Sequence, residues 1–165
     1  MIRRIGPTDI ELVQPLFNAY LEFYKCEPAP ERARAFLLEN LRLERSIIFV
    51  AYLESDNQTG ESPIGASPAG KIPIGFTQLY PRISSLSMTS YMYISDLFVD
   101  PAVRKQGIAR KLMQEAAEFS LSTGAKSIQL ETSHTNTAAQ QLYESLGYVH
   151  DTEYRTYYLK LQQSP

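Results

Sequence analysis

The sequence predicts an α/β (α+β) fold with a mixed sheet of about seven strands and four helices, in the order β-α-α-β-β-β-α-β-α-β-β. Apolar runs at 46–53 and 91–99 have the composition of buried strands. Two stretches, 107–122 and 136–146, repeat their apolar residues at helical spacing. The segment 91–132 reads as strand, helix, strand and predicts a parallel crossover, whereas the hairpins before and after it make the sheet mixed.

The N-terminal part predicts one short strand and two helices. Residues 1–5 read as the first strand, which a Gly-Pro pair ends. Apolar residues at helical spacing then run to about Phe23, and Pro15 inside this helix predicts a kink or a division into two helices. The second helix begins at Pro30, which suits a first helical turn, and continues toward Arg45.

The middle of the chain predicts three strands and two loops. The runs 46–53 and 72–80 are strands that flank a Ser-, Gly- and Pro-rich segment, 54–71, with the composition of a surface loop. Residues 81–90 read as another loop, and 91–99 as a long strand.

The last third of the chain alternates between helices and strands. A helix at 107–122, a strand at 127–132 and a helix at 136–146 follow one another, and a glycine comes soon after each helix. Residues 148–151 and 154–161 alternate or run apolar, so they predict a terminal pair of strands.

Length, charge and cysteine content limit the classes of protein. All 165 residues fit one domain, 1–165. The net charge of −2 argues against general nucleic-acid binding, which needs a basic face. Cys26 is the only cysteine, so we expect neither a disulfide nor a metal site. The sequence lacks a signal-peptide pattern and an apolar run of roughly 20 residues, so we expect a cytoplasmic protein without a membrane partner.

The turn between the strand at 91–99 and the next helix has the composition of an anion site. A helix N-terminus offers unpaired N–H groups, and Gly107 and the small Ala109 let a ligand approach them. Arg104 and Lys105 add positive charge, as does Arg110. The sequence contains neither G-x-x-x-x-G-K-[ST] nor G-x-G-x-x-G, which excludes a P-loop and a Rossmann dinucleotide site. A solvated basic helix start is the alternative.

Two motifs point to a known family. The stretch "YISDLFVDPAVRKQGIARKLM" resembles the acetyl-CoA-binding core of the GNAT superfamily of N-acetyltransferases, whose [RQ]-x-x-G-x-[GA] signature is filled by Arg104, Gly107 and Ala109. The later "NTAAQQLYESLGY" resembles the family's ending, and together they cover about residues 72–150. The tail "YRTYYLKL" resembles the diamine and polyamine branch, in which this strand contributes to a dimer in several relatives. The resemblance implies a GNAT-like domain, a homodimer, and acetyl transfer from acetyl-CoA to an amine.

The resemblance also implies where acetyl-CoA binds. Its pyrophosphate would meet the turn before the helix at 107–122, and its pantetheine arm would pair with the end of the strand at 91–99 like an added strand. For this the neighbouring strand at 127–132 must part from it. Asn136 either contacts the arm or simply caps the last helix. The implied acetyl-CoA contacts are Leu97, Phe98, Val99, Arg104, Lys105, Gln106, Gly107, Ile108, Ala109, Arg110, Asn136, Ala139 and Tyr143.

Proton transfer requires an acid and a base. Tyr143 matches the family's tyrosine, which protonates or hydrogen-bonds the departing sulfur, although the same spacing also fits an apolar helix stripe. Relatives of the diamine type read "EDFFV" where this sequence reads "SDLFV", so Ser95 replaces their candidate base and could hold a water. Successive strand residues face opposite ways, so Asp96 is no drop-in replacement. Glu131 is a candidate base, and His134 a less favoured one.

In this family the acceptor binds near the first two helices and the strands around 80–90. We predict substrate binding by Tyr24, Glu27, Tyr80 and Tyr93, because tyrosines with scattered acids suit a cationic amine. Tyrosines are also common in half-buried strands, so a purely structural role is the alternative. The acceptor would be a small amine or polyamine that attacks acetyl-CoA directly. A protein lysine or N-terminal acetyltransferase and a CoA-binding sensor without catalysis are the competing functions.

Overall fold

The computed structural model describes residues 1–54 and 71–161. Most of the loop predicted at 54–71 lies outside these residues, as do the last four residues of the chain. The chain forms two compact units, Met1–Glu131 and Thr132–Pro165.

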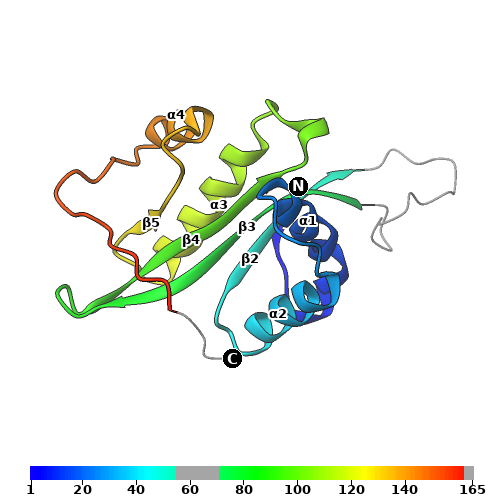
Figure 1. Ribbon diagram of the computed structural model, residues 1–165, viewed down its shortest axis with the longest axis horizontal. Coiled ribbons are helices and arrows are strands. Elements are labelled where there is room, and N and C mark those ends of the chain that lie inside the picture. Colours follow the sequence, from blue (N-terminus) through cyan, green and yellow to red (C-terminus); the bar gives the residue numbers. More distant parts are fainter. Residues whose placement is uncertain (55–70, 162–165) are drawn as a thin grey trace, which may run out of the picture. The chain divides into compact units, whose positions relative to one another are not determined.

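The first unit is built on one sheet with the strand order β1-β2-β3-β4-β5 (Figure 1). Neighbouring strands are antiparallel except for β4 and β5, which are parallel. This confirms the predicted crossover and the mixed sheet. The strands are β1 Ile2–Arg4, β2 Ile47–Glu54, β3 Lys71–Ser84, β4 Thr89–Val99 and β5 Ile128–Leu130.

Helices cover both faces of this sheet (Figure 1). Helices α1 (Ile10–Phe23) and α2 (Pro30–Arg42) lie on one face, and α3 (Ile108–Ser122) lies on the other. Helix α1 is a single helix through Pro15, so the predicted division into two does not occur. Short 3-10 turns precede α1 and α3.

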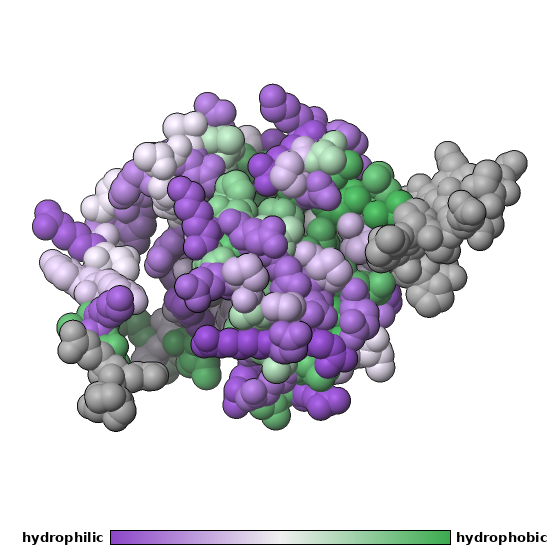
Figure 2. Space-filling view, turned by 45° about the vertical axis from the view of Figure 1, so that its right-hand side comes forward, coloured by the Kyte–Doolittle hydropathy of each residue, from purple (hydrophilic) through white to green (hydrophobic). Residues whose placement is uncertain are grey.

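The apolar core under α1 and α2 is rich in aromatic rings. Phe76 of β3 lies at its centre, with ring centroids 6.0 Å from Phe17, 5.9 Å from Tyr20 and 6.3 Å from Phe98. Rings at these separations add directional contacts to the burial of apolar area. Figure 2 shows a surface on which hydrophilic residues predominate, as expected when such side chains are buried.

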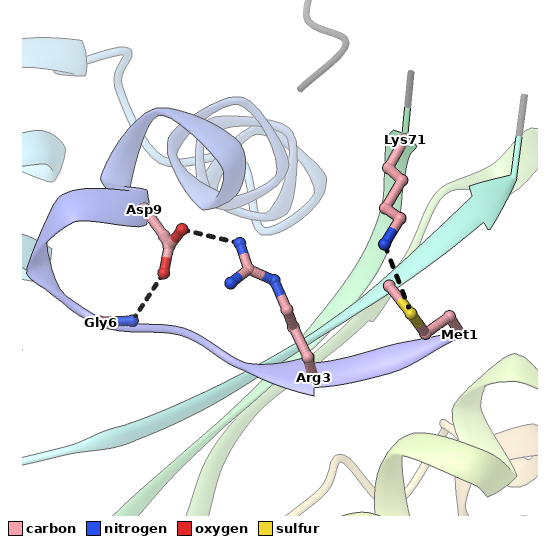
Figure 3. A network of polar contacts seen from close by, with 5 residues as sticks. All are labelled: Met1, Arg3, Gly6, Asp9 and Lys71. Carbon is pink, nitrogen blue, oxygen red and sulfur yellow. Dashed lines mark hydrogen bonds and ion pairs between the residues drawn. The ribbon is translucent and has the colours of Figure 1, made fainter. Parts of the chain in front are cut away.

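A polar network fixes the start of the chain (Figure 3). The Asp9 carboxylate accepts hydrogen bonds from the Gly6 amide at 3.0 Å and from Arg3 Nη2 at 2.7 Å. Lys71 Nζ donates to Met1 Sδ at 3.6 Å. These contacts connect Arg3 of β1 to the entry of α1, and Met1, just before β1, to the first residue of β3.

The hairpin between β3 and β4 is longer than the sequence predicts. Both strands continue into the segment predicted as a loop at 81–90, with Ser84 paired to Thr89, and only the intervening residues form the turn. The tip exposes Ile83, Leu86 and Met88 almost fully.

The second unit contains helix α4 (Thr137–Ser145). Asn136 Oδ1 accepts a hydrogen bond from the Ala139 amide at 3.3 Å, which is the predicted helix cap. Gly147 follows the helix with φ +88°, the left-handed conformation typical of a helix end.

The two terminal strands predicted at 148–151 and 154–161 are absent from the described residues, so the sheet has five strands rather than about seven. Alternating apolar residues favour a strand, but a strand also needs a partner for its N–H and C=O groups. Within the described part of this unit no other extended segment supplies one. The tail exposes large side chains, namely Val149, Tyr154, Tyr157, Tyr158, Leu159 and Leu161.

Candidate active site

A β-bulge interrupts β4 at Ser95. Gln78 of β3 pairs with Asp96, but the next residue, Leu79, pairs with Ile94, so Ser95 has no partner on β3. Residues directly opposite on neighbouring strands share a face of the sheet, and residues two apart on one strand do too. Since Tyr80 pairs with Tyr93, the bulge places Asp96 and Tyr93 on the same face.

This face carries a buried carboxylate. Asp96 is only 8% exposed, on the side of the sheet that α1 covers, and forms no ion pair with a cationic side chain in the described part of the chain. Burial raises the pKa of the Asp96 carboxyl above its ordinary range, while hydrogen bonding with Tyr20 and Ser95 opposes that shift. Strict alternation along β4 would place Asp96 and Tyr93 on opposite faces, and the bulge at Ser95 removes that alternation.

Two tyrosines lie close enough to Asp96 to respond to its charge. Burial, and after it the charge of Asp96, raises the pKa of the Tyr20 hydroxyl of α1. The same two causes raise the pKa of Tyr80 to about 12. The predicted substrate residue Tyr80 therefore belongs to one cluster with Asp96, together with Tyr20.

Gln78 adds a second buried polar group beside Asp96. Its side chain is fully buried, and its Nε2 donates to Ser46 Oγ at 2.7 Å. Its Oε1 has no hydrogen-bond partner among the residues that the structure describes. A buried oxygen left in this way is unfavourable unless a further donor binds there.

Glu131 approaches the same region from β5. Ile94 pairs with Leu130, so Glu131 follows directly beside the bulge at Ser95. Burial, and after it the charge of Glu131, raises the pKa of Tyr93, and Asp96 contributes as well. The structure therefore places Ser95, Tyr93 and Glu131 in one region of the sheet.

The two remaining predicted substrate residues lie farther along the chain, after α1. Tyr24 is more than half exposed and contacts Tyr20, with ring centroids 4.9 Å apart. Glu27 is exposed and, within the described segments, forms no hydrogen bond or ion pair. Tyr24 thus borders the cluster through Tyr20, whereas no hydrogen bond or ion pair between described residues links Glu27 to it.

The end of β4 has an edge that β5 leaves unpaired. The two strands pair only from Met92 to Ile94, and residues 95–99 have no partner on β5. Phe98 and Val99 are buried and Leu97 is half-buried, so their side chains contribute to the core. This is the separation of strands that the sequence argument expected, and it begins at the bulge.

The turn before α3 has the conformation expected of an anion site. Gly107 caps α3 with φ +77°, and Lys105 is also left-handed with φ +62°. A Cβ on Gly107 would meet no atom within 4 Å, so its role here is conformational. In the described part of the chain, the backbone amides from Lys105 to Ala109 have no hydrogen-bond partner. Unpaired amides at the start of a 15-residue helix fit a pyrophosphate group.

The side chain of Arg104, the first residue of the signature, contacts the end of β4 and α1. Its Nε donates to the Val99 carbonyl at 2.9 Å. Its guanidinium carbon lies 5.4 Å from the ring centroid of Phe23 and 5.8 Å from that of Phe98. Arg104 thus connects the end of β4 to α1, a contact that the sequence did not indicate.

The second unit holds Asn136, Ala139 and Tyr143 on and before α4. The rings of Tyr143 and Tyr148 are 6.0 Å apart. Burial, and after it the proximity of Tyr143, raises the pKa of Tyr148 to about 12. The Tyr148 hydroxyl is buried, and no described residue is its hydrogen-bond partner.

No group of three or more potential metal ligands occurs among residues 1–54 and 71–161. The helices in these segments are also too short or too polar to cross a bilayer.

Comparison with known proteins identifies the family. The profile of the Acetyltransferase (GNAT) family matches residues 13–148. The chain is 37% identical to the uncharacterized N-acetyltransferase YhfO of Bacillus subtilis (strain 168) over 160 residues, 97% of each protein. It is 26% identical to the D-amino-acid N-acetyltransferase HPA3 of Saccharomyces cerevisiae over 155 residues, 92% of this chain and 86% of the yeast protein.

A crystal structure of a probable acetyltransferase superposes with a TM-score of 0.83 at 32% identity, covering 99% of both chains. The superposition agrees with the mixed sheet and the flanking helices. The chain belongs to the GNAT family and is an N-acetyltransferase.

Proposed function

We propose that this enzyme acetylates a primary amine of a small, cationic, polyamine-like acceptor, which attacks acetyl-CoA directly. One observation carries the choice of acceptor: Asp96 and Glu131 flank the β4 bulge among tyrosines, and neither forms an ion pair within the described segments. Carboxylates and tyrosine ring faces both favour a bound ammonium group. The yeast relative named for D-amino acids also has a small molecule as its named substrate, which supports a small acceptor.

Acetyl-CoA, the donor of this family, supplies an acetyl group already activated as a thioester. The residues present fit it, and we assign its pyrophosphate to the amides of Lys105 to Arg110. The unpaired edge of β4 from Leu97 to Val99 offers backbone groups to the amides of the pantetheine arm. An N–H of Phe98 or Val99 would then stabilise the charge that develops on the thioester oxygen.

We assign the departing sulfur's proton to Tyr143, as the match to the family's motif implies. Tyr143 would then be the general acid. The ring of Tyr148 lies next to it. For the proton of the acceptor amine, Ser95 is exposed at the bulge and can hold a water, and the exposed Glu131 beside it is the candidate base.

We further propose that residues 1–165 act as one acetyltransferase domain and that the cytoplasmic protein forms a homodimer. The family profile matches residues 13–148 and so extends from the first unit into the second, which supports a single functional domain. The exposed apolar side chains of the tail support a partner chain, because side chains such as Tyr157, Tyr158 and Leu161 gain from burial.

An amine panel tests the function. Purified enzyme with acetyl-CoA is offered n-butylamine, 1,4-diaminobutane, spermidine and a peptide with a free α-amino group, while thiol release is followed. We expect release with the first three, and mass spectrometry should show one added acetyl group. Faster release with the peptide would favour a protein acetyltransferase. Tight CoA binding without release for any amine would favour a sensor.

A further inference from the structure

We infer that the side chain of Arg104 is a positioning group for the acceptor: it holds the C-terminal end of α1 against the end of β4 and so determines how tightly the amine binds. The inference rests on the proposed function, because it concerns the acceptor side of the reaction. It gives a residue of the donor signature a role in binding the other substrate.

The first contact of Arg104 is with the end of β4. Asp100, the residue after β4, donates its amide to the Ile74 carbonyl at 2.9 Å. Backbone groups of successive residues in an antiparallel strand point to opposite edges, so those of Val99 point to the edge that β5 leaves unpaired. Arg104 Nε donates to the Val99 carbonyl at 2.9 Å. Because a guanidinium is planar, this bond also sets the direction of the rest of the group.

The second contact of Arg104 is with the last residue of α1. The guanidinium carbon lies 5.4 Å from the ring centroid of Phe23 and 5.8 Å from that of Phe98. Phe98 is buried, whereas Phe23 is 57% exposed. Helix ends open locally at little cost when few buried contacts hold them. The guanidinium therefore joins an exposed helix end to a buried residue of the sheet.

Aromatic rings continue from Phe23 to the cluster around Asp96. The rings of Phe23 and Tyr24 are 5.3 Å apart and those of Tyr24 and Tyr20 are 4.9 Å apart, both edge to face. Tyr20 in turn lies 6.3 Å from the ring of Phe98 and forms a hydrogen bond with Asp96. Tyr20 and Phe23 belong to the last turn of α1, and Tyr24 follows it directly. A shift of this turn would therefore move both Tyr24 and the cluster.

The expected effect is on the acceptor rather than on the donor. If the end of α1 is correctly placed only part of the time, the apparent affinity for the amine falls in proportion to that fraction. The groups that we assign to the pyrophosphate are backbone amides of the turn before α3, and they do not depend on the ring of Phe23. Loss of the contact should thus weaken amine binding and leave CoA binding nearly unchanged.

Steady-state kinetics with n-butylamine test the inference. Arg104→Lys keeps the charge but not the planar group, Phe23→Leu removes the ring without altering the donor turn, and Phe23→Tyr keeps the ring. In the first two variants we expect the KM for the amine to rise about five- to tenfold, while kcat and the Kd for CoA change by less than about twofold. Phe23→Tyr, the conservative variant, should retain the wild-type KM, as should Arg45→Lys in an exposed ion pair.

The double variant Arg104→Lys/Phe23→Leu tests whether the two residues act through one contact. It should have the same KM as either single variant, because the second change removes a contact that is already lost. Effects on KM that multiply would overturn the inference. So would a wild-type KM in both single variants, or weaker CoA binding by Arg104→Lys with an unchanged KM for the amine.

Hydrogen exchange gives a readout that needs no acceptor. The amides of residues 24–26 donate to carbonyls in the last turn of α1. They should exchange at least about threefold faster in Arg104→Lys and Phe23→Leu, but not in Gly124→Ala, whose strain lies at the far end of α3. Faster exchange supports the inference even if no amine of the panel is acetylated, in which case the proposed function alone fails. Unchanged exchange overturns the inference and leaves the acetyltransferase function intact.

Discussion

Gly75 lies so close to Phe98 that a Cβ on Gly75 would be 2.8 Å from the Phe98 carbonyl oxygen. Real Cβ atoms do not approach a backbone oxygen this closely. The contact lies where β3 packs against the end of β4, the segment whose other edge β5 leaves unpaired.

Gly75→Ala should therefore destabilise the protein by about 1–3 kcal/mol, the usual effect of overpacking. The strand must shift because the contact is to backbone. Gly6→Ala is the control, since a Cβ there meets no atom within 4 Å and the backbone is extended. Chemical denaturation of both variants measures the difference, and equal midpoints would contradict the prediction.

Gly107→Ala should weaken CoA binding through conformation rather than packing. Its φ of +77° is strained for alanine by about 1–2 kcal/mol. Gly124, after the other end of α3, has φ +76° and equally open surroundings, so Gly124→Ala is a matched control. We expect similar losses of stability in both variants, but at least tenfold weaker CoA binding by calorimetry only in Gly107→Ala.

Arg104→Lys should behave like Arg104→Ala although it keeps the charge. Lysine has no Nε–H donor in a planar group, so both the hydrogen bond to Val99 and the stacking on Phe23 are lost. We expect each variant to unfold about 1–2 kcal/mol more easily. Arg45→Lys, in an exposed ion pair with Glu39, should change stability little. A stable Arg104→Lys would show that charge alone matters.

Tyr143→Phe tests the proposed acid. Turnover should fall by about 10- to 100-fold while CoA binding is unchanged, because only the proton donor is removed. Tyr148→Phe is the control on the neighbouring ring. Its buried hydroxyl has no partner among the described residues, so its removal should be neutral or stabilising. Wild-type turnover by Tyr143→Phe would eliminate the acid role.

Stability should depend on pH through Asp96 with a definite sign. Burial raises its pKa in the folded protein above the unfolded value of about 4. The folded state then binds the proton more tightly, so the free energy of unfolding should fall as pH rises between the two pKa values. Urea unfolding of the wild type and Asp96→Asn at several pH values measures this, and the difference between them should widen with pH and then level off.

Local sequence patterns predicted most of the fold. The apolar run at 91–99, the helical spacing of 107–122 and the signature at Arg104, Gly107 and Ala109 are properties of neighbouring residues, and these elements are present. The bulge at Ser95 depends on how β4 aligns with β3, which no local pattern records, so the sequence could not show that Asp96 shares a face with Tyr93.

The prediction of two terminal strands was wrong for a related reason. Alternating residues at 154–161 indicate what a strand would look like but do not supply its partner. The extended hairpin was missed because polar and proline residues such as Pro81 outweighed the alternation around them. Features that depend on pairing between strands are therefore the ones that the sequence predicted least well.

The unpaired edge of β4 beyond Ile94 has a consequence for how such a sequence can vary. If the donor arm pairs with this edge, the groups that hold it are main-chain atoms, which are identical in every residue except proline. Substitutions at 95–99 could then change the side chains that contact the acceptor while the main-chain hydrogen bonds to the donor remain. Such a division would let one scaffold acquire new substrates during evolution while its donor stays the same.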